Sequence, residues 1–223
     1  MKKILALIAA SVASIAIAAA DPIVVGHGYL GFGALGTTFN YDEMTPYPGM
    51  EDKDPSVFGA FFSNLEYGAG ASINIPFGGY FGVQAGVDFY VNSAGFKTDY
   101  TTLTFTYTSL DIPLLFTAKL EKWNFALGPY LSIPLGNVTA TTSSRTETYK
   151  NGRKINFGIT AGVGYEERLG MGRIVFGGRY MLDFLDNFVD DPDNFSGKSE
   201  FKFTRRALLI DIGYKLPLSF FGL

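Results

Sequence analysis

The chain lacks cysteine altogether and has only one histidine among its 223 residues. Without cysteine it can form no disulfide, no thiolate nucleophile, no cysteine-ligated metal site and no lipid-attachment site of that kind. A single histidine also excludes a multi-histidine zinc site. Basic residues number 18 against 21 acidic ones, a net charge of −3, and no basic patch is apparent. We therefore expect no cofactor and no binding to nucleic acid.

Long apolar runs are equally scarce, and the one that exists lies at the N-terminus. Met1 is followed by two lysines, residues 4–17 are apolar apart from two serines, and residues 18–20 are alanines. This is the pattern of a secretory signal peptide, and the run is short for the alternative, a membrane-spanning anchor. We predict a signal peptide over residues 1–20 and one exported domain over 21–223. Without Lys2 and Lys3 the balance is 16 basic against 21 acidic residues, or −5.

Aromatic residues and glycine are abundant, with 21 Phe, 13 Tyr and 27 Gly, so the chain is too apolar to be disordered. Runs of alternating apolar and polar residues, closed by Gly, Pro, Asn or Asp, predict eight strands. The connections alternate between tight turns near residues 78, 121 and 170 and long polar segments over 42–60, 94–103, 138–153 and 187–203. This alternation predicts an up-and-down meander. The predicted strands lie near 24–41, 61–77, 80–93, 104–120, 122–137, 154–167, 172–186 and 204–218.

The two faces of the predicted strands indicate where the domain resides. In the last four strands one face is apolar and uncharged, with residues such as Trp123, Phe157 and Ile210, whereas the other carries glycines and charges. A soluble barrel or sandwich would leave those glycines in solvent, where they weaken a strand. Bulky residues facing lipid and small or charged ones facing a narrow lumen explain both faces. The sequence therefore predicts an all-β protein, an eight-stranded antiparallel up-and-down transmembrane β-barrel of the bacterial outer membrane.

The first four strands follow this pattern less regularly. Tyr107 lies on the wrong parity for its strand, so we expect either a bulge near residues 108–109 or a strand end beyond the membrane. The strand near 24–41 is too rich in glycine to orient. Tyr80, Trp123 and Tyr165 lie near strand ends, which predicts an aromatic belt at the membrane interface.

Charged residues on the inward face come from seven of the predicted strands. Charges in a poorly solvated lumen must pair, because isolated burial costs several kcal/mol. We therefore predict a lumen charge network with Arg179 near its centre, facing Asp88, Asp111 or Asp211, since a guanidinium can serve two carboxylates. Such a network would either close the barrel or form the constriction of a gated pore. Its predicted members are Glu66, Asp88, Asp111, Lys119, Glu166, Arg173, Arg179, Asp183, Arg205, Asp211 and Lys215.

Four short motifs in order carry a resemblance to a known family. Residues 107–115, YTSLDIPLL, resemble the Y-x-x-L-E-I-P-L-L strand of the bacterial outer-membrane β-barrel domain family that includes PorT-like proteins, with Asp111 in place of Glu. Residues 128–130 (GPY), 157–165 (FGITAGVGY) and 179–180 (RY) are similar to later strands of that family. The resemblance covers about 104–218. It implies an outer-membrane barrel and brings no catalytic residues.

The predicted last strand resembles a second known pattern. Residues 211–218, DIGYKLPL, resemble the C-terminal signal read by the barrel assembly machinery, displaced by five residues from the end of the chain. The resemblance implies that this machinery is a partner of the last strand. The predicted barrel itself makes the lipid bilayer of the outer membrane the other partner and favours a monomer, and the sequence does not identify an extracellular ligand.

The sequence leaves three functions open. The first is a structural or surface-interaction role without catalysis, and the second is a narrow pore or transporter for small solutes or apolar molecules. The third is a lipid-modifying barrel enzyme, which would need either His27 as the base or a pair of the lumen carboxylates for acid–base catalysis. No motif surrounds His27, so we expect it to be structural or solvent-exposed. Residues 190–194 (DDPDN) could offer oxygens to calcium, but their spacing fits no hand-type loop and Pro192 interrupts them, so we predict no metal site.

Overall fold

The computed structural model describes residues 22–38, 65–77, 79–97, 102–141, 146–149, 154–185 and 202–221. The predicted signal peptide, the connection over 42–60 and the acidic segment over 190–194 lie outside these residues. Within the described ranges, no helix has the length and apolar character needed to cross a membrane.

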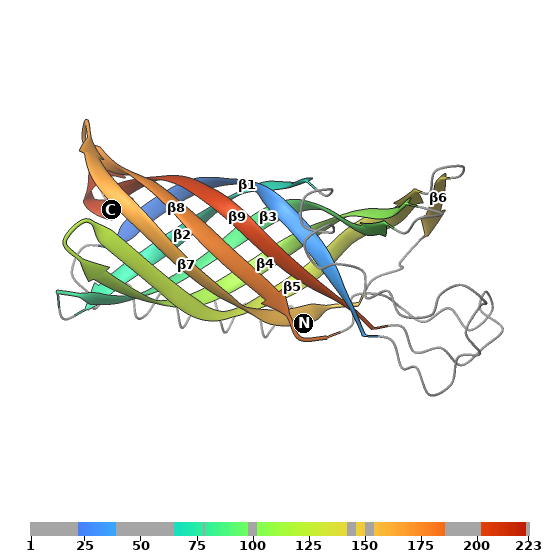
Figure 1. The fold of residues 1–223 in the computed structure, drawn as a ribbon. Coiled ribbons are helices and arrows are strands. Elements are labelled where there is room, and N and C mark those ends of the chain that lie inside the picture. The colour runs from blue at the N-terminus through green and yellow to red at the C-terminus, as the bar shows by residue number, and fades with distance from the viewer. Residues whose placement is uncertain are drawn as a thin grey trace, which may run out of the picture.

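The described residues form nine strands in one antiparallel sheet (Figure 1). Each strand pairs with the next along the chain, except around β6, which pairs only with β5. Strand β5 pairs with β4 along one edge, and along its other edge with β7 and then, further toward its C-terminal end, with β6. The first strand pairs with the last, β1 with β9, so the sheet closes. The fold is therefore a closed, eight-stranded up-and-down barrel to which β6 is appended. The elements are β1 (Ile23–Thr38), β2 (Leu65–Phe77), β3 (Phe81–Lys97), β4 (Thr102–Leu120), β5 (Trp123–Thr141), β6 (Thr146–Tyr149), β7 (Asn156–Leu169), β8 (Gly172–Asp183), β9 (Lys202–Pro217) and the 3-10 turn η2 (Leu218–Phe221).

Three tight turns lie at one end of the barrel, which we call the short-turn end. Gly79, Glu121 and Gly170 lie in these turns with φ of 79°, 54° and 61°, a left-handed conformation suited to tight hairpins. The 3-10 turn η2 lies at the same end, where the backbone N–H of Leu218 donates to the carbonyl of Pro22 at 2.7 Å. The opposite end, where β6 lies, holds the strand ends that flank the long connections (Figure 1).

The two faces of the barrel wall separate as predicted. In β7, Phe157, Ile159 and Val163 are exposed on the outside of the barrel, whereas the intervening Gly158 and Thr160 are buried inside it. The same alternation in β2 places Tyr67 outside. Bulky apolar residues on the outer surface match the lipid-facing band of a membrane barrel.

Two predicted long loops are wrong in extent. Strands β3 and β4 continue as a paired hairpin to Lys97 and Thr102, through most of the segment 94–103. Strand β5 continues to Thr141 and pairs with β6, within the segment 138–153. These segments are rich in Thr, Phe and Tyr, which favour strands. The sequence prediction ended each strand where the alternation of apolar and polar residues stops. A hairpin that extends beyond the barrel does not have lipid on one face and the lumen on the other, so its strands need not alternate.

A register irregularity occurs near residues 108–109, one of the two expectations for this region, but it does not bring Tyr107 to the outer face. The register between β3 and β4 is the same on both sides of Tyr107, which is buried inside the barrel on the face of Asp111. The register shift occurs instead between β4 and β5, where Thr106 pairs with residue 139 and Thr108 with residue 135. The extra residues therefore belong to β5, and they include Gly136 with φ of 70°.

Candidate functional site: the charged lumen

The charged side chains inside the barrel form three levels along its axis. The outer level lies toward the long connections and is centred on Arg205 of β9. Its Nη2 donates to Glu66 Oε2 at 2.9 Å and its Nη1 to Asp111 Oδ2 at 3.3 Å. All three side chains are 1% exposed or less. The guanidinium also lies over the ring of Tyr90, 5.1 Å from its centroid, a cation–π contact.

Neutral donors complete the outer level. Ser132 Oγ donates to Asp111 Oδ1 at 2.6 Å. Asp183 accepts from the hydroxyl of Tyr130, and from Asn156 Nδ2 at 3.4 Å. These contacts give each buried carboxylate of this level a donor, which burial of a charged group requires.

The middle level is centred on Arg179 of β8. Its Nη1 lies 3.2 Å from Asp88 Oδ2 and its Nη2 lies 3.3 Å from Asp211 Oδ2. Asp88 also contacts His27 Nε2 at 2.8 Å and accepts from the Tyr29 hydroxyl at 3.2 Å. The guanidinium lies 4.6 Å from the Tyr29 ring centroid. The carboxylate of Asp88 therefore contacts an arginine, a histidine and a tyrosine.

Glycines on neighbouring strands make room for these carboxylates. A Cβ at position 33 would lie 2.0 Å from Oε1 of Glu66, and a Cβ at position 70 would lie 2.0 Å from Oδ1 of Asp88. Any larger residue at Gly33 or Gly70 would therefore displace the carboxylate that binds Arg205 or Arg179.

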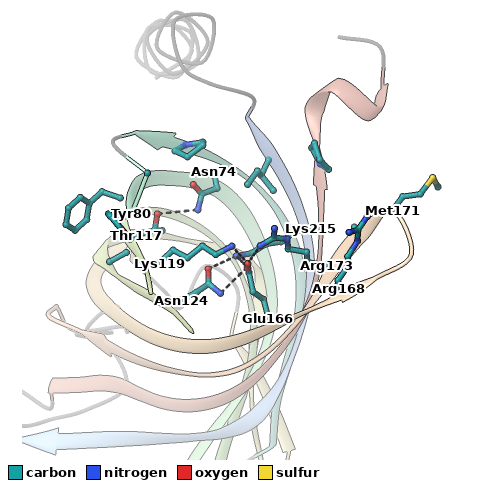
Figure 2. A pocket seen from close by; sticks show the side chains of 17 residues that line it. Asn74, Tyr80, Thr117, Lys119, Asn124, Glu166, Arg168, Met171, Arg173 and Lys215 are labelled. Atoms are coloured by element: carbon teal, nitrogen blue, oxygen red, sulfur yellow. Dashed lines mark hydrogen bonds and ion pairs between the residues drawn. The ribbon is translucent and has the colours of Figure 1, made fainter. Parts of the chain in front are cut away.

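The inner level lies toward the short-turn end and is centred on Glu166 of β7 (Figure 2). Glu166 accepts from Lys119 and Arg173, and from Lys215 Nζ at 3.1 Å. Asn124 Nδ2 donates to the same carboxylate at 3.1 Å. The Glu166 side chain is 3% exposed, whereas that of Arg173 is 53% exposed. This level lies at the floor of a cavity of about 400 Å³ that is open at the short-turn end.

The structure places every predicted lumen charge on the inward face and sorts the residues into these levels. Arg179 faces two of the three carboxylates expected for it, Asp88 and Asp211. The third, Asp111, instead lies beside Arg205.

Several large lumen residues were missed by the sequence reasoning. The lumen was expected to be too narrow for bulky side chains, but Tyr29, Tyr90, Tyr130 and Met181 cluster there, each 4% exposed or less. Their positions in the alternation could have predicted that they face the lumen. Tyr90 lies two residues from Asp88 and Met181 two residues from Arg179, so each is on the same face of its strand as that charged residue.

The glycines of the inward face explain how the tyrosines fit. A Cβ at position 68 would lie 2.8 Å from the Tyr90 ring, and one at position 158 would lie 2.7 Å from the Tyr130 ring. Glycine therefore opens space for a few specific rings instead of marking a lumen that excludes all of them.

His27 lies inside the barrel and is 7% exposed. Its prediction as a structural histidine fits this position, because a lipid-modifying site needs its base on a lipid-facing groove. No group of three or more metal-ligating side chains occurs in the part of the chain that the structure describes, and residues 190–194 fall outside it.

A family model named outer membrane protein beta-barrel domain matches residues 27–189. The match spans 163 of the 223 residues. The chain belongs to this family. It is therefore an outer-membrane protein, and the apolar outer surface of its barrel contacts the lipid bilayer. In such barrels the short turns face the periplasm, so the inner level lies on the periplasmic side.

Solved structures with the same kind of fold are similar at low identity. They include Neisserial surface protein A (14% identity, TM-score 0.43, 90% of this chain and 99% of that one). Ail, the attachment invasion locus protein of Yersinia pestis, is 12% identical (TM-score 0.39, 88% and 99%). OprG from Pseudomonas aeruginosa is 10% identical (TM-score 0.42, 89% and 97%). No curated protein matches the chain. The fold assignment rests on the strand pairing itself.

Proposed function

We propose that the protein is a closed, non-catalytic outer-membrane barrel with a structural or surface-interaction role. The observation that carries the proposal is the direction of the two buried arginines. Arg205 of β9 reaches Asp111 of β4, and Arg179 of β8 reaches Asp88 of β3. In the closed order of eight strands each pair joins diametrically opposite walls. The lumen is therefore crossed twice by ion pairs, at two successive levels.

These crossings leave no continuous path for a solute. An ion that passed through the barrel would have to separate buried pairs, and breaking such a pair costs several kcal/mol. Between the middle and inner levels lies a void of about 70 Å³, bordered by His27 and Lys215. It has room for roughly two water molecules. The lumen serves as a rigid polar core, and the long connections are left to meet extracellular partners.

The same proposal covers the export and assembly of the barrel. Residues 1–20 would be removed on export, and the barrel would insert as a monomer. Strand β9 would be read by the barrel assembly machinery, and it completes the sheet by pairing with β8 on one edge and β1 on the other. A lipid-modifying activity gains no support from His27, because its ring is directed at Asp88 inside the wall.

Conductance across a planar lipid bilayer tests the closed lumen. The purified wild-type barrel is expected to give no channel steps. A pore would give steps of constant size that change in Arg179→Ala or Asp111→Asn, and such steps in the wild type would contradict the proposal. Gel mobility in SDS controls for folding, because a closed β-barrel resists SDS until it is heated. The unboiled sample must therefore migrate differently from the boiled one.

A further inference from the structure

The periplasmic mouth of the barrel carries an excess of positive charge. Its cavity of about 400 Å³ is bordered by turns of the short-turn end and has the inner level as its floor (Figure 2). Among the described residues, the carboxylate of Glu166 and four cations line this cavity. The cations are Lys119, Arg168, Arg173 and Lys215.

Three of these cations form an unbroken row across neighbouring strands. Arg168 of β7 lies directly opposite Arg173 of β8, and Arg173 lies directly opposite Lys215 of β9. Like charges placed opposite each other in an antiparallel pair destabilise a sheet. A row of three therefore has an electrostatic cost that a bound anion would offset.

The carboxylate of Glu166 does not neutralise the row of three cations. Glu166 is shared by Lys119, Arg173 and Lys215. Within the described part of the chain, the guanidinium of Arg168 has no carboxylate partner; only its backbone N–H contacts Glu167. Glu167 itself is on the opposite face of β7, where it pairs with Lys122 at 2.5 Å. The lining side chains that the structure describes thus carry four positive charges and one negative charge.

Neutral polar groups complete the mouth. Asn124 contacts both Glu166 and Lys215, and Asn74 Nδ2 donates to Thr117 Oγ1 at 3.3 Å. On the rim, Tyr80 and Met171 are 63% and 72% exposed. The mouth therefore combines a cationic wall, side-chain amides and an apolar rim at the level of the lipid headgroups.

We propose that this mouth binds a phosphate group on the periplasmic side of the membrane. Guanidinium groups match the oxygen geometry of phosphate, and two of them in register present several donors to one oxoanion. The cavity volume lies within the range of small-molecule sites, so it accommodates a phosphate with a small substituent. The phosphate can come from a free phosphate compound or from an anionic phospholipid of the periplasmic leaflet.

The experiment uses the whole barrel in nanodiscs of zwitterionic phosphatidylcholine, titrated with inorganic phosphate in a calorimeter. Saturable binding is expected for the wild type. The double variant R168Q/R173Q is expected to bind about tenfold or more weakly, because it loses charged hydrogen bonds to the anion. The matched control is K122Q, which removes one positive charge at the same end of the barrel but on the outer face. K122Q is expected to bind as the wild type does.

A second arm identifies the source of the phosphate. Each protein is reconstituted into mixed phosphatidylcholine and phosphatidylglycerol, and the lipid retained on delipidation is measured. Phosphate binding in pure phosphatidylcholine supports a free phosphate ligand. Retention of phosphatidylglycerol by the wild type and K122Q, but not by R168Q/R173Q, without binding of free phosphate, supports a lipid headgroup.

Two results would overturn the proposal. One is a wild type that neither binds phosphate nor retains phosphatidylglycerol, and the other is an R168Q/R173Q variant equal to the wild type in both arms. Because both arginines are exposed, the variant is expected to keep its heat-dependent gel shift. None of these readouts depends on whether the lumen conducts.

Discussion

Arg205 and Asp111 meet across the full width of the barrel, with Nη1 and Oδ2 3.3 Å apart, although the two residues are 94 positions apart in the sequence. Three strands separate β9 from β4 on either side of the closed sheet. The pair can therefore form only when the barrel is closed. The pairing of these charges therefore depends on the tertiary structure and not on the pairing of neighbouring strands.

Substitution of Arg205 by Ala is expected to destabilise the barrel by about 3–5 kcal/mol, because it leaves Glu66 and Asp111 buried without their cation. Reversible urea unfolding in lipid vesicles measures the change. The control is Arg173→Ala, whose side chain is 53% exposed, and its cost is expected to be below about 1 kcal/mol. Equal stability of the two variants would show that the outer level does not hold the barrel together.

Gly33→Ala is expected to destabilise the barrel by about 1–3 kcal/mol, because its Cβ would overlap the Glu66 carboxylate that Arg205 holds. Gly26→Ala, in the same strand, has nothing within 4 Å of its new Cβ and should change stability little. The temperature at which the SDS-resistant form is lost compares the two. If Gly26→Ala proves the more damaging, steric room for Glu66 is not what requires glycine at position 33.

Glu166→Gln is expected to destabilise the barrel because it leaves Lys119, Arg173 and Lys215 close together without their shared carboxylate. Added salt screens this repulsion, so the difference from the wild type should shrink between low and high ionic strength. Glu167→Gln is the control, since Glu167 is exposed and pairs with Lys122 on the outer face. Urea unfolding at two salt concentrations gives the comparison. A deficit in Glu166→Gln that is independent of salt would point to packing and not to charge.

The single tryptophan allows a test of the membrane position. Trp123 is 50% exposed at the short-turn end of β5, and its ring contacts that of Tyr165 at 5.4 Å between centroids. Its fluorescence is expected to be quenched best by lipids brominated near the headgroup.

The double variant Trp123→Phe/Leu127→Trp supplies the comparison for this measurement. It moves the indole four residues along β5, about 13 Å toward the bilayer centre before allowance for strand tilt. Lipids brominated deeper in the chains should then quench it better. The same quenching profile for both proteins would contradict the proposed depth of the short-turn end.

Much of the fold could be predicted because the two faces of each strand meet different solvents. Lipid selects side chains such as Phe157 and Ile210, the lumen selects glycines and charges, and a period of two records both selections in the sequence. The strand number and the inward position of Arg179 followed from that signal. The signal weakened at Tyr107 and in β1, where inward tyrosines mimic the lipid-facing pattern. Strand alternation also failed to indicate where β3 and β5 end.

The sequence by itself determined the eight-stranded barrel, its apolar outer surface and the charged residues that face the lumen, since these follow from the alternation along each strand. Only the tertiary structure decided which charges pair. Alternation gives the face of a residue but not its height along the axis or its partner across the lumen, and these depend on the register of all eight strands. For that reason Asp111 lies beside Arg205 and not Arg179, and His27 and Tyr29 converge on Asp88.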